Sequence, residues 1–112
     1  MKFSIDKQDK YVVFTLEEER LHTLNAPDVK SEMVVLNSEG LQNIILDLSV
    51  VNFVDSSGLS AILTTNRLCK AINGNLILTG VQENVKKLIQ ISQLDSILTI
   101  IPTVQEAIET IK

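Results

Sequence analysis

The stretch Phe53-Val54-Asp55-Ser56-Ser57-Gly58-Leu59 decides the fold, because an extended apolar segment passes there into a helix. Its first two residues are typical of a buried strand, and Asp55 or Ser56 can cap the helix that follows. Gly58 permits close packing of the turn. The stretch therefore predicts a strand-to-helix turn that presents serine hydroxyls at the positive end of a helix.

The segments on either side of this turn complete a βαβ unit. Upstream, Asn43–Leu48 is dense in branched aliphatic side chains and is predicted to be a central strand. Downstream, 57–72 has the apolar period of a helix, and Leu76–Thr79 follows the turn pair Asn73-Gly74 as another strand. This order implies parallel pairing with a right-handed crossover. We expect the inward positions of the helix to be Leu59, Ile62, Leu63, Asn66 and either Leu68 or Cys69.

The rest of the chain alternates in the same way. A loop over Glu17–Asn25 precedes a helix that Asn25 can cap, with Pro27 in the first turn and Gly40 at the end. The other expected elements are paired strands over 3–5 and 11–16, a helix over 82–91, a strand over 97–101, and a closing helix that begins with the capping box Thr103–Glu106. The chain is thus predicted to be one α/β domain over residues 1–112, with a mixed sheet of four to five strands and about four helices.

Composition excludes several classes of protein. A chain of 112 residues with 45% hydrophobic content can fold around one core without disulfide bonds or a structural metal. Its net charge of −4 comes without a concentrated basic face, which argues against direct nucleic-acid binding. No apolar run reaches the roughly 20 residues that span a membrane. Because the first residues also lack the apolar core of a secretory signal, a cytoplasmic location is expected.

Histidine and cysteine each occur once, as His22 and Cys69. We therefore expect no metal site and no cofactor, and we expect Cys69 to be a packed thiol on a buried helix face. A serine hydrolase is disfavoured because only His22 could serve as the base and no Gly-x-Ser-x-Gly elbow is present. These observations predict a protein that is not an enzyme.

The turn at Asp55–Gly58 allows two interpretations. In the simpler one, Asp55 or Ser56 caps a helix and Gly58 allows tight packing. In the other, a serine of the turn is phosphorylated and gains about −1.5 to −2 charges at pH 7. The start of a helix tolerates such a charge, whereas an apolar or acidic partner packed over the turn would not. Such a site could switch binding off without refolding the domain.

The same residues resemble the signature of STAS domains, and most closely that of bacterial anti-sigma factor antagonists. The resemblance covers nearly the whole chain, with further matches at Ala26-Pro27, 44–48, 74–78 and 85–89. It implies a partner-switching protein, which binds an anti-sigma factor serine kinase while unphosphorylated and so frees a sigma factor. The kinase then phosphorylates the antagonist, and a phosphatase resets it.

Carried onto this sequence, the resemblance implies that Ser56 is the phosphoacceptor, with Ser57 as the second choice. Asp55 would position the acceptor hydroxyl and contact the kinase. A monomer without nucleic acid, membrane insertion or cofactor is expected. The expected partner-binding residues are Asp55, Ser57, Gly58, Leu59, His22 and Asn25.

The sequence departs from the family pattern in the loop before Ala26. Members often carry Gly-x-x-Asp there, and the corresponding positions hold Glu19 and His22. Gln93 also stands where a glycine is common. Because the altered loop borders the partner surface, an alternative function is an accessory subunit of a lipid-transport ABC system or a constitutive signalling scaffold.

Overall fold

A five-stranded mixed sheet lies at the centre of the computed structural model, which describes residues 1–111. The strands lie in the order β1-β2-β4-β6-β7. The antiparallel pair is β1 with β2, and all other neighbours are parallel. Their bounds are β1 Phe3–Lys7, β2 Val12–Leu16, β4 Asn43–Asp47, β6 Asn75–Thr79 and β7 Thr99–Ile101.

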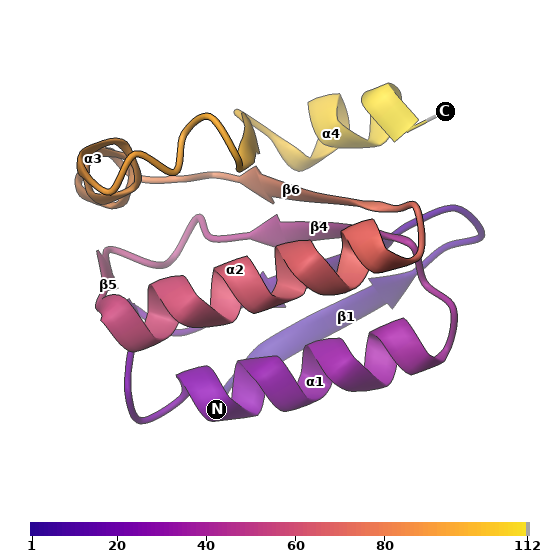
Figure 1. Ribbon diagram of the computed structural model, residues 1–112, viewed down its shortest axis with the longest axis horizontal. Coiled ribbons are helices and arrows are strands. Elements are labelled where there is room, and N and C mark those ends of the chain that lie inside the picture. Colours follow the sequence, from indigo (N-terminus) through magenta and orange to yellow (C-terminus); the bar gives the residue numbers. More distant parts are fainter. Residues whose placement is uncertain (112) are drawn as a thin grey trace.

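Four helices in residues 1–111 cover the two faces of this sheet: α1 (Ala26–Ser38), α2 (Ser56–Ala71), α3 (Glu83–Ile91) and α4 (Val104–Ile111). Figure 1 shows α1 and α2 side by side on one face and α4 on the other. The predicted mixed sheet with about four helices is confirmed, as is the βαβ unit β4-α2-β6. None of these helices is long and apolar enough to cross a membrane.

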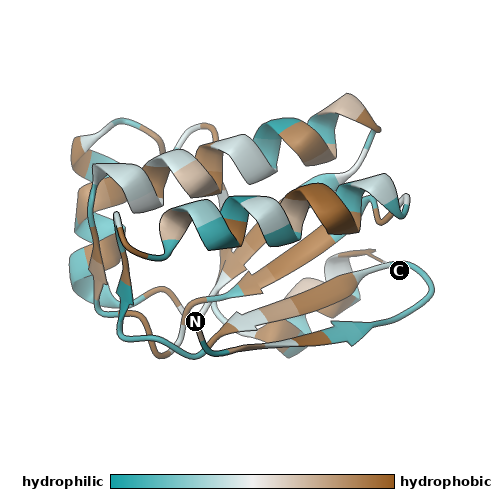
Figure 2. Cartoon of the chain, turned by 90° about the horizontal axis from the view of Figure 1, so that it is seen from below, coloured by the Kyte–Doolittle hydropathy of each residue, from teal (hydrophilic) through white to brown (hydrophobic). Residues whose placement is uncertain are grey.

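The alternation of side chains along each strand builds a separate core on each face. Phe14, Leu46 and Leu78 are fully or almost fully buried under α1 and α2. On the opposite face, Ile45 packs with its neighbours from β2 and β6 beneath Ala107 of α4. The central strands are accordingly the most hydrophobic part of the chain (Figure 2).

A second, two-stranded sheet lies beside the N-terminal start of α2. It pairs β3 (Arg20–Leu21) with β5 (Phe53–Val54) in parallel, so the prediction that 17–25 is entirely a loop is wrong at these two residues. The expectation of a buried strand is also wrong for Phe53, which is 42% exposed. The Arg20 guanidinium lies 5.0 Å from the centre of this exposed Phe53 ring, which is a cation–π distance.

Helix α2 begins one residue earlier than predicted and is rotated slightly from the expected orientation. Ile62, Asn66 and Cys69 are buried as predicted, but Leu59 and Leu63 are only partly buried. The small residues Ala61 and Thr65 are fully buried instead. Burial raises the pKa of the Cys69 thiol to about 11, which fits a packed thiol.

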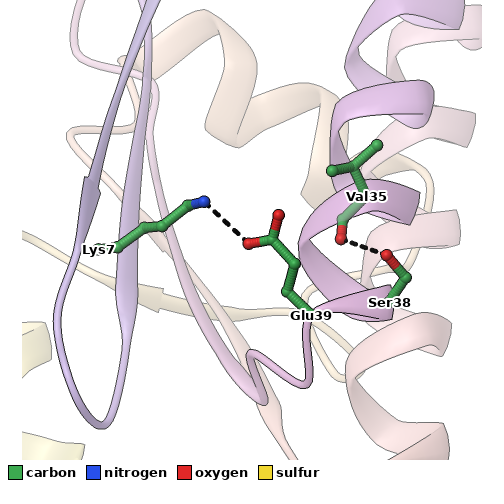
Figure 3. A network of polar contacts seen from close by, with 4 residues as sticks. All are labelled: Lys7, Val35, Ser38 and Glu39. Carbon is green, nitrogen blue, oxygen red and sulfur yellow. Dashed lines mark hydrogen bonds and ion pairs between the residues drawn. The ribbon is translucent and has the colours of Figure 1, made fainter.

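An ion pair ties the open edge of the sheet to the end of α1. The Nζ of Lys7, the last residue of β1, lies 2.8 Å from an Oε of Glu39, which follows α1 (Figure 3). Both side chains are largely exposed, so this pair adds little to stability. Gly40 ends the helix in the left-handed region, with φ +81°, as the sequence predicted.

Candidate functional site

The N-terminus of α2 is closed by a side-chain cap. The Oδ1 atom of Asp55 accepts a hydrogen bond of 2.9 Å from the backbone N–H of Gly58. Asp55 is itself extended, because it continues the direction of β5, and this leaves its carboxylate over the first turn of the helix. Of the two residues expected to cap, Asp55 does so and Ser56 is the first residue of the helix.

The second oxygen of the same carboxylate holds the neighbouring loop. Oδ2 of Asp55 accepts hydrogen bonds from the backbone N–H of Thr23 at 3.0 Å and from its hydroxyl at 3.1 Å. The Thr23 hydroxyl also lies 3.3 Å from the hydroxyl of Ser57. Asp55 thus links the start of α2 to the loop at Thr23, which lies 32 positions earlier in the sequence.

These contacts favour the ionised carboxylate. The pKa of Asp55 lies below its ordinary value of 3.8, chiefly because the Gly58 N–H donates to it, with further lowering from Thr23. Partial desolvation opposes this shift without reversing it. The cap is therefore negatively charged at neutral pH and complements the positive end of α2.

Gly58 is needed for the close approach of α2 to β3. A Cβ atom at this position would lie 2.2 Å from the carbonyl oxygen of Leu21 and 2.9 Å from its carbonyl carbon. The two elements can therefore meet only if residue 58 has no side chain. This contact positions the two preceding residues, Ser56 and Ser57, relative to β3.

The two serines of the turn have different surroundings. Ser56 is exposed, and within residues 1–111 no side-chain hydrogen bond holds its hydroxyl. Ser57 is half-buried and lies beside the Thr23 hydroxyl. Of the two, Ser56 thus presents the hydroxyl that an incoming protein can reach without displacing an internal contact.

A cavity of about 290 Å³ opens beside these serines, between α1 and the start of α2. The Nζ of Lys30 enters it from α1 and donates a hydrogen bond of 3.2 Å to the hydroxyl of Ser60. Neither Thr23 nor Lys30 was predicted as part of the site, because both come from segments distant in sequence. The lining residues are Thr23, Ala26, Pro27, Lys30, Ser56, Ser57 and Ser60.

Asn25 occupies the N-cap position of α1, as expected, but its side chain makes no capping hydrogen bond, which corrects that part of the expectation. Its side chain turns back into the preceding loop, where Oδ1 accepts from the His22 N–H at 2.9 Å and Nδ2 donates to the Arg20 carbonyl at 2.7 Å. Asn25 is buried, so its amide holds the loop from within. Beside it, Leu24 is 82% exposed.

The remaining predicted residues lie around the turn but not in the same cavity. His22 is half-buried and lines a separate hollow of about 500 Å³ with the acidic residues Glu17–Glu19. Leu59 packs partly against the main core. The structure thus places Ser56 and Ser57 in one cavity, next to the Asp55 cap, and His22 in a different hollow.

The mixed sheet carries α1 and α2 on one face, and Asp55 caps a serine turn at the start of α2. Both features agree with the expected STAS domain. The family model of the STAS domain matches residues 2–107. The chain therefore belongs to the STAS domain family, as predicted.

Relatives named as anti-sigma factor antagonists are similar to this chain. The anti-sigma-B factor antagonist of Staphylococcus epidermidis is 26% identical over 78 residues, which cover 70% of this chain and 72% of that protein. The structure of the anti-sigma factor antagonist SpoIIAA in its unphosphorylated form has a TM-score of 0.83 and 24% identity, covering 97% and 95% of the two chains. The phosphorylated form of SpoIIAA, a Bacillus cell fate determinant, has a TM-score of 0.77 and 24% identity, covering 99% and 100%.

Proposed function

We propose that this protein is an anti-sigma factor antagonist that works by phosphorylation-controlled partner switching in the cytoplasm. In its unphosphorylated form it binds an anti-sigma factor serine kinase and so frees a sigma factor. The kinase transfers the γ-phosphoryl group of ATP to the hydroxyl oxygen of Ser56, which loses its proton while ADP leaves. A phosphatase hydrolyses the ester with water and restores the hydroxyl. The protein itself acts by binding and performs no catalysis.

The observation that carries this proposal is that the Ser56 hydroxyl is exposed while hydrogen bonds hold the backbone around it. Asp55 fixes the backbone of the turn through Gly58 and Thr23, while the Ser56 hydroxyl stays exposed. A kinase needs an accessible hydroxyl on a well-positioned backbone, and Ser56 meets both requirements. That SpoIIAA has been solved in both unphosphorylated and phosphorylated forms supports control by phosphorylation.

Phosphorylation at this position can control binding by electrostatics alone. The modification adds about −1.5 to −2 charges at pH 7 on the surface that the partner covers. Exposed Leu24 lies on the loop next to the site and offers an apolar contact for that partner. A phosphate buried against such a contact would lose its hydration, so the complex would dissociate without any change of fold.

Binding to the cognate kinase tests this proposal. We expect Ser56→Asp to weaken the complex by several-fold or more and Ser56→Ala to leave it intact, as measured by isothermal titration calorimetry. Each tenfold loss in affinity corresponds to about 1.4 kcal/mol. Equal affinities for the wild type and Ser56→Asp would contradict the switch.

A second candidate is a constitutive scaffold or an accessory subunit of a lipid-transport ABC system. It is favoured by the loop, where Glu19 and His22 replace the common Gly-x-x-Asp pattern and His22 lines a hollow separate from the serine cavity. Under this function Ser56→Asp would leave partner binding nearly unchanged. Genes beside the coding gene discriminate as well, since a kinase and phosphatase support the first function and a permease and ATPase support the second.

A further inference from the structure

We propose that Lys30 is the internal counter-ion for a phosphate on Ser56. The inference rests on the proposed function, since it describes how the phosphorylated state is held. In the unmodified protein, the Lys30 ammonium donates to the Ser60 hydroxyl. On phosphorylation it exchanges this neutral acceptor for a phosphate oxygen.

The spacing along α2 places the two acceptors within reach of one cation. Ser56 and Ser60 are four positions apart on the helix, so their side chains lie on the same face with about 5–6 Å between their Cβ atoms. Both line the cavity that Lys30 enters from α1. An ammonium already bound at Ser60 therefore needs only a rotation of its flexible stem to meet a phosphate on Ser56.

The charges around the cavity make this exchange favourable. Within residues 1–111, no carboxylate lies within ion-pairing distance of Lys30, so its charge is not already neutralised. The first turn of α2 holds no acidic residue. The acidic residues that adjoin the cavity-lining residues in sequence are Asp55, whose carboxylate is bound by Gly58 and Thr23, and Asp28 in the first turn of α1. A charge-assisted bond to phosphate is also stronger than the present bond to a neutral hydroxyl.

The exchange would change the partner-binding surface in a second way. A phosphate paired to Lys30 links α1 to α2 and removes a free ammonium from the surface beside the serines. The partner therefore meets two changes at once, a new anion and a cation that is no longer available.

Phosphorus-31 NMR on protein that carries phosphoserine at position 56 tests the proposal. The residue is installed by genetic code expansion, so the experiment needs no kinase and stays separate from the test of the function itself. We expect the second pKa of the phosphate to rise by about 0.5 unit in Lys30→Gln relative to the wild type, because a nearby cation favours the dianion. Asp28, Asp55 and His22 are the same in all variants and cancel from the comparison.

Matched variants keep the test decisive. Lys70→Gln removes the same charge from the last turn of α2, about 21 Å along the helix and beyond the screening length, and should leave the phosphate pKa unchanged. Lys30→Arg should retain the low value, and Ser60→Ala should keep or lower it further, because Lys30 then has no competing acceptor. An equal phosphate pKa in the wild type and Lys30→Gln, or a rise of the phosphate pKa in Lys70→Gln as large as that in Lys30→Gln, overturns the proposal.

Discussion

The carboxylate of Asp55 binds Thr23 through both the backbone N–H and the hydroxyl, although the two residues are separated by 32 positions in the sequence. The same carboxylate caps α2 through the N–H of Gly58. One side chain therefore sets the position of the serine turn relative to the loop in front of it. This relationship makes the surface around Ser56 a single unit rather than two independent loops.

Thr23→Val should loosen this unit. The change keeps the shape of the side chain and the backbone N–H bond but removes the hydroxyl that contacts Asp55 and Ser57. We expect unfolding in urea to require about 0.5–1 kcal/mol less free energy, the low end for a hydrogen bond, because Thr23 is exposed. Thr23→Ser keeps the hydroxyl and should stay within error of the wild type. Equal stability of Thr23→Val and the wild type would show that the hydroxyl contact contributes nothing.

Gly58→Ala should destabilise the domain even though alanine is the better helix former. A methyl group at this position meets the Leu21 carbonyl oxygen at 2.2 Å, so α2 and β3 must separate. We expect a loss of about 2–3 kcal/mol in chemical denaturation, as for an overpacked core site. Helix propensity alone would give a gain of roughly 1 kcal/mol, so the sign of the change decides between the two accounts. Thr64→Ala on the same helix serves as the control for propensity, because the Thr64 side chain makes no hydrogen bond within residues 1–111.

Most of the fold could be predicted because its elements carry strong local patterns. The branched aliphatic runs of β4 and β6 and the period of α1 identify them without reference to the rest of the chain. β3 was missed because two residues carry no period, and its strand character arises only from pairing with β5. Asn25 was misjudged for a similar reason, since its amide finds better partners in the folded loop than at the helix start.

The site could be predicted only where its residues are contiguous. Asp55 as the cap follows from its type and its place before a helix, whereas the choice between it and Ser56 required the structure. Thr23 reaches the turn from the loop after β3 and Lys30 reaches it from α1, and no spacing in the sequence predicts that proximity. For Thr23, the one signal in the sequence was its place directly after His22, a position that departs from the family pattern.

The pH dependence of stability should carry the signature of Asp55. Its pKa is lower in the folded protein than the ordinary 3.8, so its stabilising contribution is fully present above that value and is lost as the pH falls through the lower folded pKa. We expect Asp55→Asn to be less stable than the wild type at neutral pH. The difference in unfolding free energy should shrink as the pH drops below 3.8. A difference that stays constant across this range would show that the charge of Asp55 is not what stabilises the turn.

Gln93→Gly should stabilise the protein. Gln93 has a φ of 60°, which is strained for a side chain with a Cβ, and it follows the end of α3 where Leu94 N–H donates to the Ile89 carbonyl. We expect a gain of about 1 kcal/mol in unfolding free energy from thermal or urea denaturation. Asn73→Gly at φ 61° is the matched comparison and should gain less, because asparagine tolerates this conformation. A loss of stability in Gln93→Gly would contradict the assignment of strain.

The central claim is that Ser56 is the residue through which a kinase controls this domain. Intact mass spectrometry after incubation with the cognate anti-sigma factor kinase and ATP, followed by mapping of the modified peptide, tests it most directly. We predict the addition of one phosphate at Ser56 in the wild type, the same addition in Ser57→Ala, and none in Ser56→Ala. Full modification of Ser56→Ala, or no incorporation into the wild type under conditions where the two proteins bind, would contradict the account.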